Sequence, residues 1–300
     1  MPPPAAFYDI PAPAKINLFL HVVGRRQDGY HLLQSVFVLI DWADRLHLER
    51  RADGRLQRHD LGPALPEDDL CLRAARALQQ ASGCPLGADI HLDKQVPWGA
   101  GLGGGSSDAA STLLALNRLW GLHWPRARLA ELALGLGADV PFFIGGRNAF
   151  VEGIGEVLHP LPEAALPPQW FAVVKPAPAI ATPTIFRSPL LVRDTKAAIV
   201  MDFLAHAATR LSAESGDTGY GRNDLQPPAE AICPEVTQVA RWLQERFGNS
   251  RMSGSGSAVF ARAGTGSTPL ATWKADELPP TWVGRMCRSL VSHPLVHWAD

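Results

Sequence analysis

"VPWGAGLGGGSSDAA", residues 96–110, places five glycines in seven residues and then changes abruptly to good helix formers. Each glycine costs roughly 0.5–1 kcal/mol relative to alanine when it is fixed in regular structure, so the chain needs bare backbone here. Glycines let backbone N–H groups turn toward phosphate oxygens, and the helix that follows points its positive end at the same place. Ser106 and Ser107 add two hydroxyls. The stretch therefore predicts a site for a polyphosphate.

Other glycine-rich sites fit the stretch less well. Gly99, Gly101 and Gly104 match the G-x-G-x-x-G fingerprint of dinucleotide sites, but the acidic residue expected about 20 positions later is absent. No Gly-Lys-Ser/Thr closes a Walker loop, and the chain contains neither the HRD nor the DFG tripeptide of protein kinases. A flexible surface loop is disfavoured because the glycines adjoin a helix start instead of separating two domains.

The bulk composition is that of a globular protein. The chain has 300 residues, 46% hydrophobic and 19% charged, with a formal net charge of −1, which allows one large or two modest domains. Near-neutral charge argues against nucleic-acid and membrane-surface partners. No apolar run approaches the ~18 residues of a membrane span, and the first ten residues do not resemble a signal peptide. We expect a cytoplasmic protein with four reduced cysteines, Cys71, Cys84, Cys233 and Cys287.

Hydrophobic periodicity predicts a mixture of strands and helices. Two apolar runs flank "RRQDG", in which Asp28-Gly29 is a hairpin turn signal. We expect serine caps before the helix that follows the glycines, and an interruption of the last helix at Pro234. The predicted elements are strands over 15–24, 28–41, 44–51, 87–97, 148–161, 171–176 and 258–263, helices over 67–83, 106–121, 125–137, 195–212 and 229–248, and an irregular turn over 137–146.

A proline-rich passage, residues 160–170, marks the expected domain boundary. We therefore divide the chain into an N-terminal domain, residues 1–162, which carries the phosphate loop, and a C-terminal domain, residues 163–300. Residues 264–280 show no periodicity that predicts a structure.

The glycine stretch resembles the phosphate loop of the GHMP kinases, the galactokinase, homoserine, mevalonate and phosphomevalonate kinase superfamily. Three further segments match one branch of it in the same order: "PAPAKINLFLHVVGRRQDGYH" (11–31), "LGADVPFFIGG" (136–146) and "RMSGSGSAVF" (251–260). The resemblance implies a two-domain α+β fold, with an N-terminal domain like ribosomal protein S5 domain 2 and a ferredoxin-like C-terminal domain. The active site is then expected in the cleft between them.

The resemblance also implies the reaction. The γ-phosphoryl group of ATP, bound with Mg²⁺, is transferred to an alcohol of a small molecule, here a methylerythritol linked to cytidine diphosphate. Between Ser107 and Asp139 the only acids are Asp108 and Glu131, so protein ligands of magnesium are not identified. The residues expected to hold ATP are Pro97, Trp98, Gly99, Ala100, Gly101, Leu102, Gly103, Gly104, Gly105, Ser106 and Ser107.

Two residues are expected to be catalytic. Asp139 would take the proton of the attacking hydroxyl, and Lys15 would stabilise that carboxylate and the hydroxyl. Taken singly, Asp139 also fits an Asx turn or a helix cap, and Lys15 also fits a solvated strand end; the resemblance favours catalysis. The run "SGSGS", residues 253–257, resembles a segment that folds back against the phosphate loop, because small residues let two backbones approach closely.

Five residues are expected to bind the substrate. Asn17 lies one strand alternation beyond Lys15 and would orient the substrate. Tyr30 and His31 offer an aromatic face and a polar edge for a pyrimidine, and Phe186 would close the other side of the ring, with Thr182 near the ribose or phosphates.

Two other functions remain open at this point. One is a sibling kinase of the superfamily that acts on homoserine or mevalonate. The other is a non-catalytic sensor that binds ATP without turnover, because a fold does not by itself establish an activity.

Overall fold

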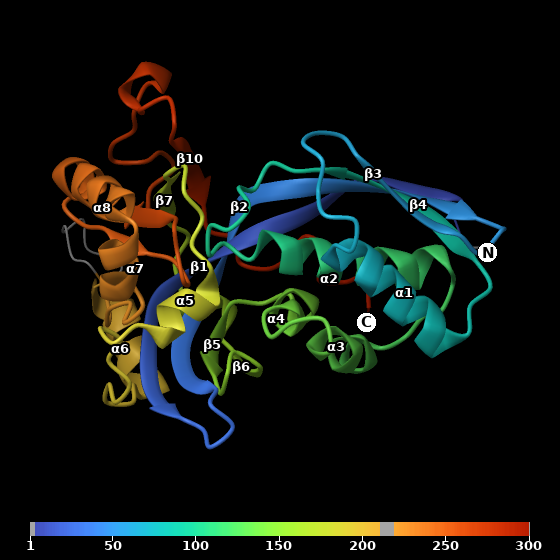
Figure 1. Ribbon diagram of the computed structural model, residues 1–300, viewed down its shortest axis with the longest axis horizontal. Coiled ribbons are helices and arrows are strands. Elements are labelled where there is room, and N and C mark those ends of the chain that lie inside the picture. The colour runs from blue at the N-terminus through green and yellow to red at the C-terminus, as the bar shows by residue number, and fades with distance from the viewer. Residues whose placement is uncertain (1–3, 211–218, 300) are drawn as a thin grey trace.

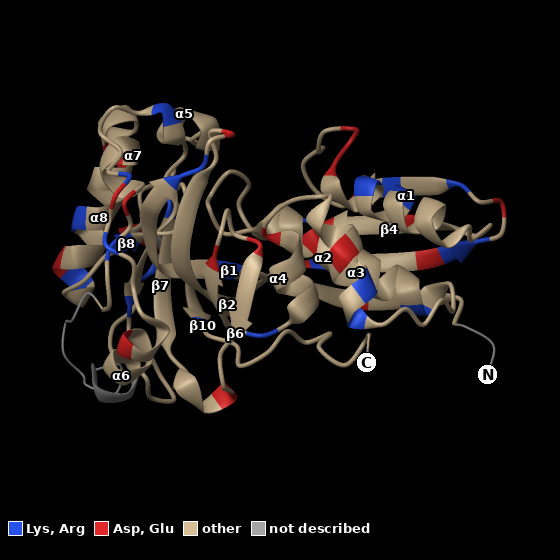
Figure 2. Cartoon of the chain, turned by 90° about the horizontal axis from the view of Figure 1, so that it is seen from below, with Lys and Arg blue, Asp and Glu red and all other residues tan. Residues whose placement is uncertain are grey.

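Two lobes lie side by side along the longest axis of the molecule (Figure 1). The structure is a computed structural model that describes residues 4–210 and 219–299. One lobe contains most of a six-stranded sheet, ordered β3-β4-β2-β5-β6 with β1 paired to β2, and the other contains a four-stranded antiparallel sheet, ordered β10-β7-β9-β8. Lys and Arg and also Asp and Glu occur on both lobes (Figure 2).

The first part of the chain contains both strands and helices. They are β1 (Ala6–Arg25), β2 (His31–Arg51), β3 (Leu56–Asp60), α1 (Leu70–Ser82), β4 (Gly87–Asp93), α2 (Gly104–Leu119), α3 (Arg126–Leu134), α4 (Val140–Gly145), β5 (Ala149–Glu152) and β6 (Val157–Pro160).

The second part begins with a 3₁₀ turn at Glu163–Ala165. Its further elements are β7 (Trp170–Lys175), α5 (Thr182–Arg187), α6 (Val200–Arg210), α7 (Gln226–Ile232), α8 (Pro234–Phe247), β8 (Arg251–Met252), β9 (Val259–Arg262), a 3₁₀ turn at Ala275–Glu277, and β10 (Val283–Arg288). Residues 211 and 212, at the end of the predicted helix 195–212, lie outside the described residues.

The hairpin of β1 and β2 connects the two lobes. Its strands have 20 and 21 residues, and Gly29 forms the predicted turn at a φ of 93°. Alternate residues of β2 belong to different cores: Phe37 and Leu39 pack under helices α1–α4, whereas Val38 and Ile40 pack against β7 and β9. A strand that is buried on both faces reads as a continuous apolar run, which explains the sequence "SVFVLI".

The four-stranded sheet is also covered on both faces. In β7, Phe171 and Val173 face the hairpin, whereas Ala172 and Val174 face α7 and α8. The chain then returns to the first lobe, where Leu295 is buried in the core below α2. The division at residues 162 and 163 stays a prediction, because no feature of the described chain tests it directly.

Several sequence expectations need correction. Residues 44–51 are not a separate strand but the continuation of β2. The predicted irregular turn over 137–146 contains the helix α4, because Pro141 fits the first turn of a helix. The strand β10 was not predicted. Its sequence, VGRMCR, lacks a clear alternation of apolar and polar residues.

The start of α2 also differs from the expected serine cap. Gly103, at a φ of 71°, occupies the N-cap position and no side chain caps the helix. Ser106 and Ser107 therefore lie within the first turn of the helix. The N-terminal N–H groups of α2 are left without a side-chain partner, which suits an anion site.

Two glycine-rich segments lie against each other, as the sequence predicts. Ala258 N donates to Ala100 O at 3.1 Å, and Lys15 N donates to Leu102 O at 2.9 Å. A Cβ on Gly101 would lie 2.2 Å from the backbone oxygen of Ser253, and its φ is 72°. This approach is possible only for glycine, so it brings the phosphate loop, β1 and residues 253–257 together.

Among the described residues, no helix combines the length and the apolar character that crossing a bilayer needs. All four cysteines are free, as expected.

The close approach at Gly101 generates a stability prediction. Gly101→Ala should lower the free energy of unfolding by more than about 2 kcal/mol, because it adds left-handed backbone strain to a clash with backbone. Gly105→Ala is the matched control: Gly105 is helical, and its added Cβ would meet Leu70 at an ordinary 3.6 Å. Urea unfolding measures both variants, and equal midpoints would contradict the account.

Candidate active site

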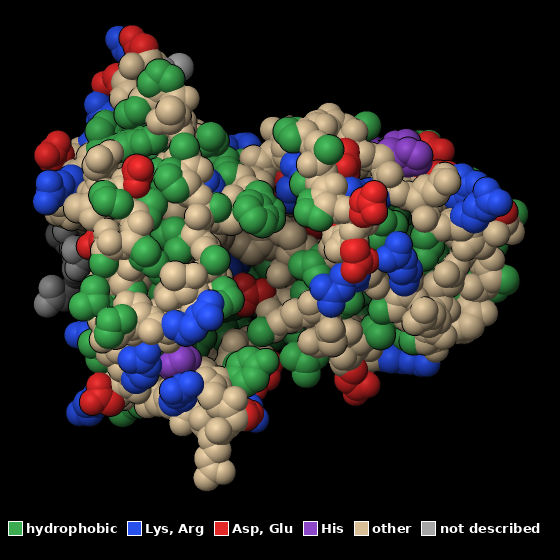
Figure 3. All heavy atoms as spheres, in the orientation of Figure 1, with side chains coloured by type: hydrophobic (Ala, Val, Ile, Leu, Met, Phe, Trp, Pro, Cys, Tyr) green, Lys and Arg blue, Asp and Glu red, His purple; other side chains and the backbone are tan. Residues whose placement is uncertain are grey.

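The space-filling view shows the molecule hollowed between the two lobes (Figure 3). A cavity of about 290 Å³ is lined by residues from β1, β2, the glycine loop, the start of α4, α5 and residues 254–256. These segments are far apart in sequence, and the cavity exists only because the hairpin and the two glycine-rich segments meet there.

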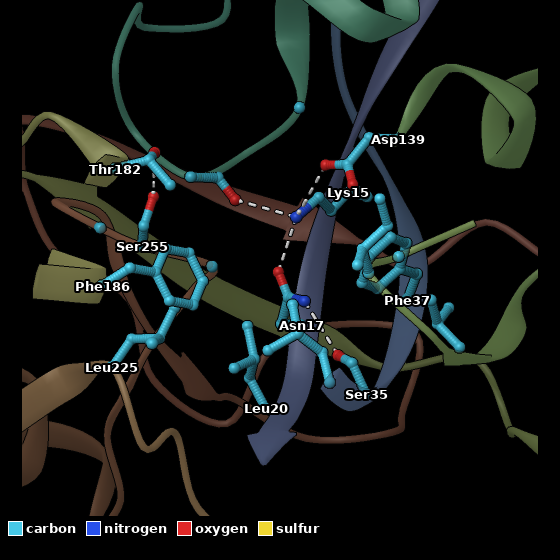
Figure 4. A pocket seen from close by; sticks show the side chains of 18 of the residues that line it. Lys15, Asn17, Leu20, Ser35, Phe37, Asp139, Thr182, Phe186, Leu225 and Ser255 are labelled. Atoms are coloured by element: carbon cyan, nitrogen blue, oxygen red, sulfur yellow. Dashed lines mark hydrogen bonds and ion pairs between the residues drawn. The ribbon is translucent and has the colours of Figure 1, made fainter. Parts of the chain in front are cut away.

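Lys15 is the charged centre of this cavity (Figure 4). Its side chain is buried, and its Nζ lies 2.6 Å from Asn17 Oδ1, 3.3 Å from Gly101 O and 3.5 Å from Asp139 Oδ2. The same nitrogen lies 4.6 Å from the centre of the Phe37 ring. Burial lowers the pKa of Lys15, and the Asp139 carboxylate opposes that shift.

Asp139 directs its carboxylate into the cavity toward Lys15 (Figure 4). It occupies the N-cap position of α4, but its side chain makes no capping hydrogen bond. The helix-cap alternative therefore does not account for it. Its side chain keeps 31% exposure and lines the cavity, so it is accessible to a ligand there. Lys15 and Asp139, which the sequence analysis expects to act together, form an ion pair in the structure.

Asn17 is almost fully buried, and both ends of its amide are engaged. Its Oδ1 accepts from Lys15, and its Nδ2 donates to Ser35 Oγ at 2.9 Å. Asn17 thus holds the Lys15 ammonium in place, and its expected contact with substrate stays a prediction. Ser35 was not identified from the sequence, because nothing in the run "LLQSVFV" distinguishes it from a strand residue.

A second cavity, of about 370 Å³, lies on the other side of the glycine loop. Its lining includes residues 96–106 and Asp108, and so nearly all of the expected ATP residues; Ser107 is buried behind them. Gly99, Gly101 and Gly103 line both this cavity and the one that contains Lys15. The two cavities therefore share a wall of glycine backbone.

A buried charge cluster behind the loop was missed from the sequence. Lys94 Nζ contacts Asp44 and lies 2.6 Å from Asp108 Oδ2, and Asp44 also accepts from the backbone N–H of Val96 at 2.7 Å. Burial raises the pKa of Asp108, and Lys94 counteracts this only in part. The cluster anchors the entry to the glycine loop. No local sequence pattern reveals this cluster, because Asp44, Lys94 and Asp108 are far apart in the sequence.

A third cavity, of about 700 Å³, contains the expected pyrimidine residues Tyr30, His31, Thr182 and Phe186. Tyr30 is 58% exposed, and Thr182 Oγ1 lies 2.7 Å from Ser255 Oγ. The cavity shares Leu33, Ile154, Thr182 and Phe186 with the cavity around Lys15. The three cavities are thus adjacent, with Lys15 and Asp139 in the middle one.

The arrangement of the aromatic residues refines the expected pyrimidine site. The His31 ring stacks directly on Phe186, with ring centres 4.9 Å apart and planes inclined by 23°. No base fits between two rings at that distance, so His31 and Phe186 are not opposite walls. The arrangement leaves room for the expected contacts, in which Tyr30 lies on one face of the pyrimidine and Phe186 on the other.

Comparison with known proteins identifies relatives over the whole chain. Residues 69–147 match the GHMP kinases N terminal domain, and residues 204–269 match GHMP kinases C terminal. The chain is 68% identical to a 4-diphosphocytidyl-2-C-methyl-D-erythritol kinase of Methylibium petroleiphilum, over 98% of both chains.

Solved structures agree with these matches. A crystal structure of 4-(cytidine 5'-diphospho)-2C-methyl-D-erythritol kinase has a TM-score of 0.76 and 36% identity, covering 95% of this chain and 98% of that chain. A homoserine kinase from Cytophaga hutchinsonii has a TM-score of 0.67 over 97% of this chain and 96% of that chain, but at 16% identity it shows the fold alone. The expected two-domain α+β fold of the superfamily is confirmed.

The geometry around Lys15 predicts how its charge responds to its neighbour. The pKa of Lys15 should lie below the ordinary 10.5, and Asp139→Asn should lower it further, because the carboxylate favours the charged ammonium. An NMR titration of ¹³Cε-labelled lysine measures both values. A pKa that rises or stays constant in the variant would show that the two groups do not interact.

Proposed function

The chain belongs to the GHMP kinases and, within them, to the 4-diphosphocytidyl-2-C-methyl-D-erythritol kinases, and from this membership we propose its reaction. ATP phosphorylates 4-diphosphocytidyl-2-C-methyl-D-erythritol to its 2-phosphate, a step in the non-mevalonate route to isoprenoid precursors. The observation that carries the proposal is the buried Lys15 ammonium, 3.5 Å from Asp139, between a glycine-walled cavity and an aromatic one.

Asp139 and Lys15 divide the work on the alcohol. The Asp139 carboxylate accepts the proton of the attacking hydroxyl, and the Lys15 ammonium stabilises the negative charge that develops on the oxygen. Asn17 fixes the direction of the ammonium through its Oδ1. Phosphoryl transfer depends mainly on alignment and charge stabilisation, and these three side chains supply both for the nucleophile.

The glycine loop serves the phosphates of ATP. Gly99, Gly101 and Gly103 all have positive φ values, a left-handed backbone conformation that other residues rarely adopt. The N–H groups at the start of α2 are not capped by a side chain. They are therefore free to donate to phosphate oxygens, and the helix dipole adds attraction for negative charge. We assign residues 97–107 to this role.

Magnesium would be held at the start of α2. Among the described residues, no group of three or more His, Cys, Asp or Glu side chains is arranged for a metal ion. However, Ser107 Oγ and Asp108 Oδ1 are buried without a hydrogen-bond partner in the described chain, and hydroxyl and carboxylate oxygens suit this ion. These two residues would hold it together with the ATP phosphates, whose charge it neutralises.

The aromatic cavity would take the cytidine end of the substrate. Tyr30 and Phe186 supply faces for the pyrimidine, and His31 supplies a polar edge. Thr182 lies where this cavity joins the one around Lys15, so it would contact the linking ribose or phosphates. We further propose that the domains divide at residues 162 and 163 and that the enzyme works in the cytoplasm.

The reaction is tested directly by ADP release. Purified protein with MgATP should turn over the cytidine substrate and neither homoserine nor mevalonate. Asp139→Asn should lower kcat by about 10²–10⁴-fold, the usual contribution of a general base, while the Kd for ATP stays nearly constant. Turnover of homoserine or mevalonate alone would indicate a sibling kinase, and ATP binding without any turnover would indicate a sensor.

The stacking role of Tyr30 predicts a selective loss of substrate binding. Tyr30→Ala should raise the KM for the cytidine substrate by about tenfold, since base–aromatic stacking contributes roughly 1–3 kcal/mol, and leave the KM for ATP unchanged. Tyr8→Ala is the control, because Tyr8 is equally exposed, at 61%, but lines none of the three cavities. Equal increases in both KM values would refute the assignment.

A further inference from the structure

Arg193 lies behind the aromatic cavity and is held by the backbone. Its Nη1 donates to Leu191 O at 3.0 Å, and its Nη2 donates to Phe186 O and Ser188 O, each at 3.0 Å. No carboxylate of the described chain forms an ion pair with it. Three backbone hydrogen bonds therefore fix the plane of the guanidinium, and they leave its Nε–H pointing in one direction.

That direction is toward His31. Arg193 Nε lies 3.1 Å from His31 Nε2. A guanidinium can only donate, so His31 Nε2 must accept and cannot carry a hydrogen. The ring is then neutral with its hydrogen on Nδ1. Burial, Arg193 and Arg25 all lower the pKa of His31, in that order of size, which agrees with a neutral ring.

The Nδ1–H of His31 is thereby left as a fixed donor. Nδ1 has no hydrogen-bond partner within the described chain, and His31 lines the aromatic cavity. The stack with Phe186, whose own carbonyl bonds Arg193, prevents the ring from rotating freely. One arginine therefore sets both the orientation and the tautomer of the imidazole.

A fixed donor distinguishes the two common pyrimidines. Cytosine N3 is an acceptor, whereas uracil N3 carries a hydrogen and donates. A histidine that was free to move its hydrogen to Nε2 would accept from uracil and so tolerate both rings. A site built around one hydrogen-bonding pattern rejects the analogue that lacks it, because a buried polar group is left unpaired.

We propose that Arg193 is a specificity-determining positioning residue: it locks His31 as the Nδ1–H tautomer, so that the aromatic cavity accepts a cytosine ring through N3 and rejects uracil. This inference rests on the proposed function, because it places the pyrimidine of the substrate beside His31. Arg193 itself lines none of the three cavities.

The first experiment measures a ratio of affinities. Calorimetry without ATP gives the Kd of 4-diphosphocytidyl-2-C-methyl-D-erythritol and of its uridine counterpart, for the full-length protein and for Arg193→Met. The preference for cytidine should fall by about tenfold or more in the variant, the scale of one lost hydrogen-bond discrimination. If Arg193 merely supports the loop, both affinities fall together and the ratio is unchanged, which would overturn the proposal.

Two further variants sharpen this comparison. Arg187→Met is the matched control: Arg187 lines the same cavity, but its Nε donates to Pro183 O and not to His31, so the ratio should stay constant. Arg193→Lys keeps a group that only donates, and it should restore part of the cytidine preference. Loss of the preference in Arg187→Met to the same extent would attribute it to the positive charge of the cavity and would contradict the tautomer lock.

The second experiment observes the tautomer itself. ¹⁵N NMR of histidine-labelled wild-type protein should show His31 with a hydrogen on Nδ1 and a bare Nε2, and Arg193→Met should shift the population toward Nε2–H. A wild-type ring with Nε2–H would overturn the inference whatever the affinities are. This readout needs no turnover, so it separates failure of the lock from failure of the proposed reaction, which would appear as absent ADP release.

Discussion

The burial of one ammonium group, that of Lys15, is the constraint on which the site depends. An ion of this size loses several kcal/mol of solvation when it is buried, so it must be surrounded by compensating groups. Asn17, the Gly101 carbonyl, the Asp139 carboxylate and the Phe37 ring supply that compensation. They come from β1, the glycine loop, the start of α4 and β2, and the charge is therefore stable only when all four segments are assembled. The site and the fold are stabilised by the same contacts.

The long hairpin and the glycines make this assembly possible. The hairpin carries Lys15 into the space between the lobes because β2 is buried on both faces. Glycine at 101 lets the phosphate loop touch the backbone of residue 253, and glycine at 103 leaves room for the Lys15 side chain, since a Cβ there would lie 3.2 Å from its Cε. Bare backbone thus has two uses: it lines the cavity proposed for the phosphates of ATP on one side and leaves room for Lys15 on the other. These close approaches account for Gly101 and Gly103.

The sequence predicted what depends on neighbouring residues and missed what depends on distant ones. The glycine loop, the turn at Gly29 and the break before Pro234 are local patterns, and each lies where it was expected. Lys15 and Asp139 were paired only through a family resemblance, since no local rule brings residues 124 positions apart within 3.5 Å. The Lys94–Asp108, Asn17–Ser35 and His31–Arg193 contacts join positions 14, 18 and 162 residues apart, and no local pattern marks them. Only the folded chain shows them.

The most direct test of this account is a double-mutant cycle on Lys15 and Asp139, measured as kcat/KM with the cytidine substrate. If the two groups act as one unit, either Lys15→Met or Asp139→Asn removes most of what the pair contributes. The double variant should then be nearly as active as the slower single variant. A double variant whose loss equals the product of the two single losses would show independent groups and would contradict the account.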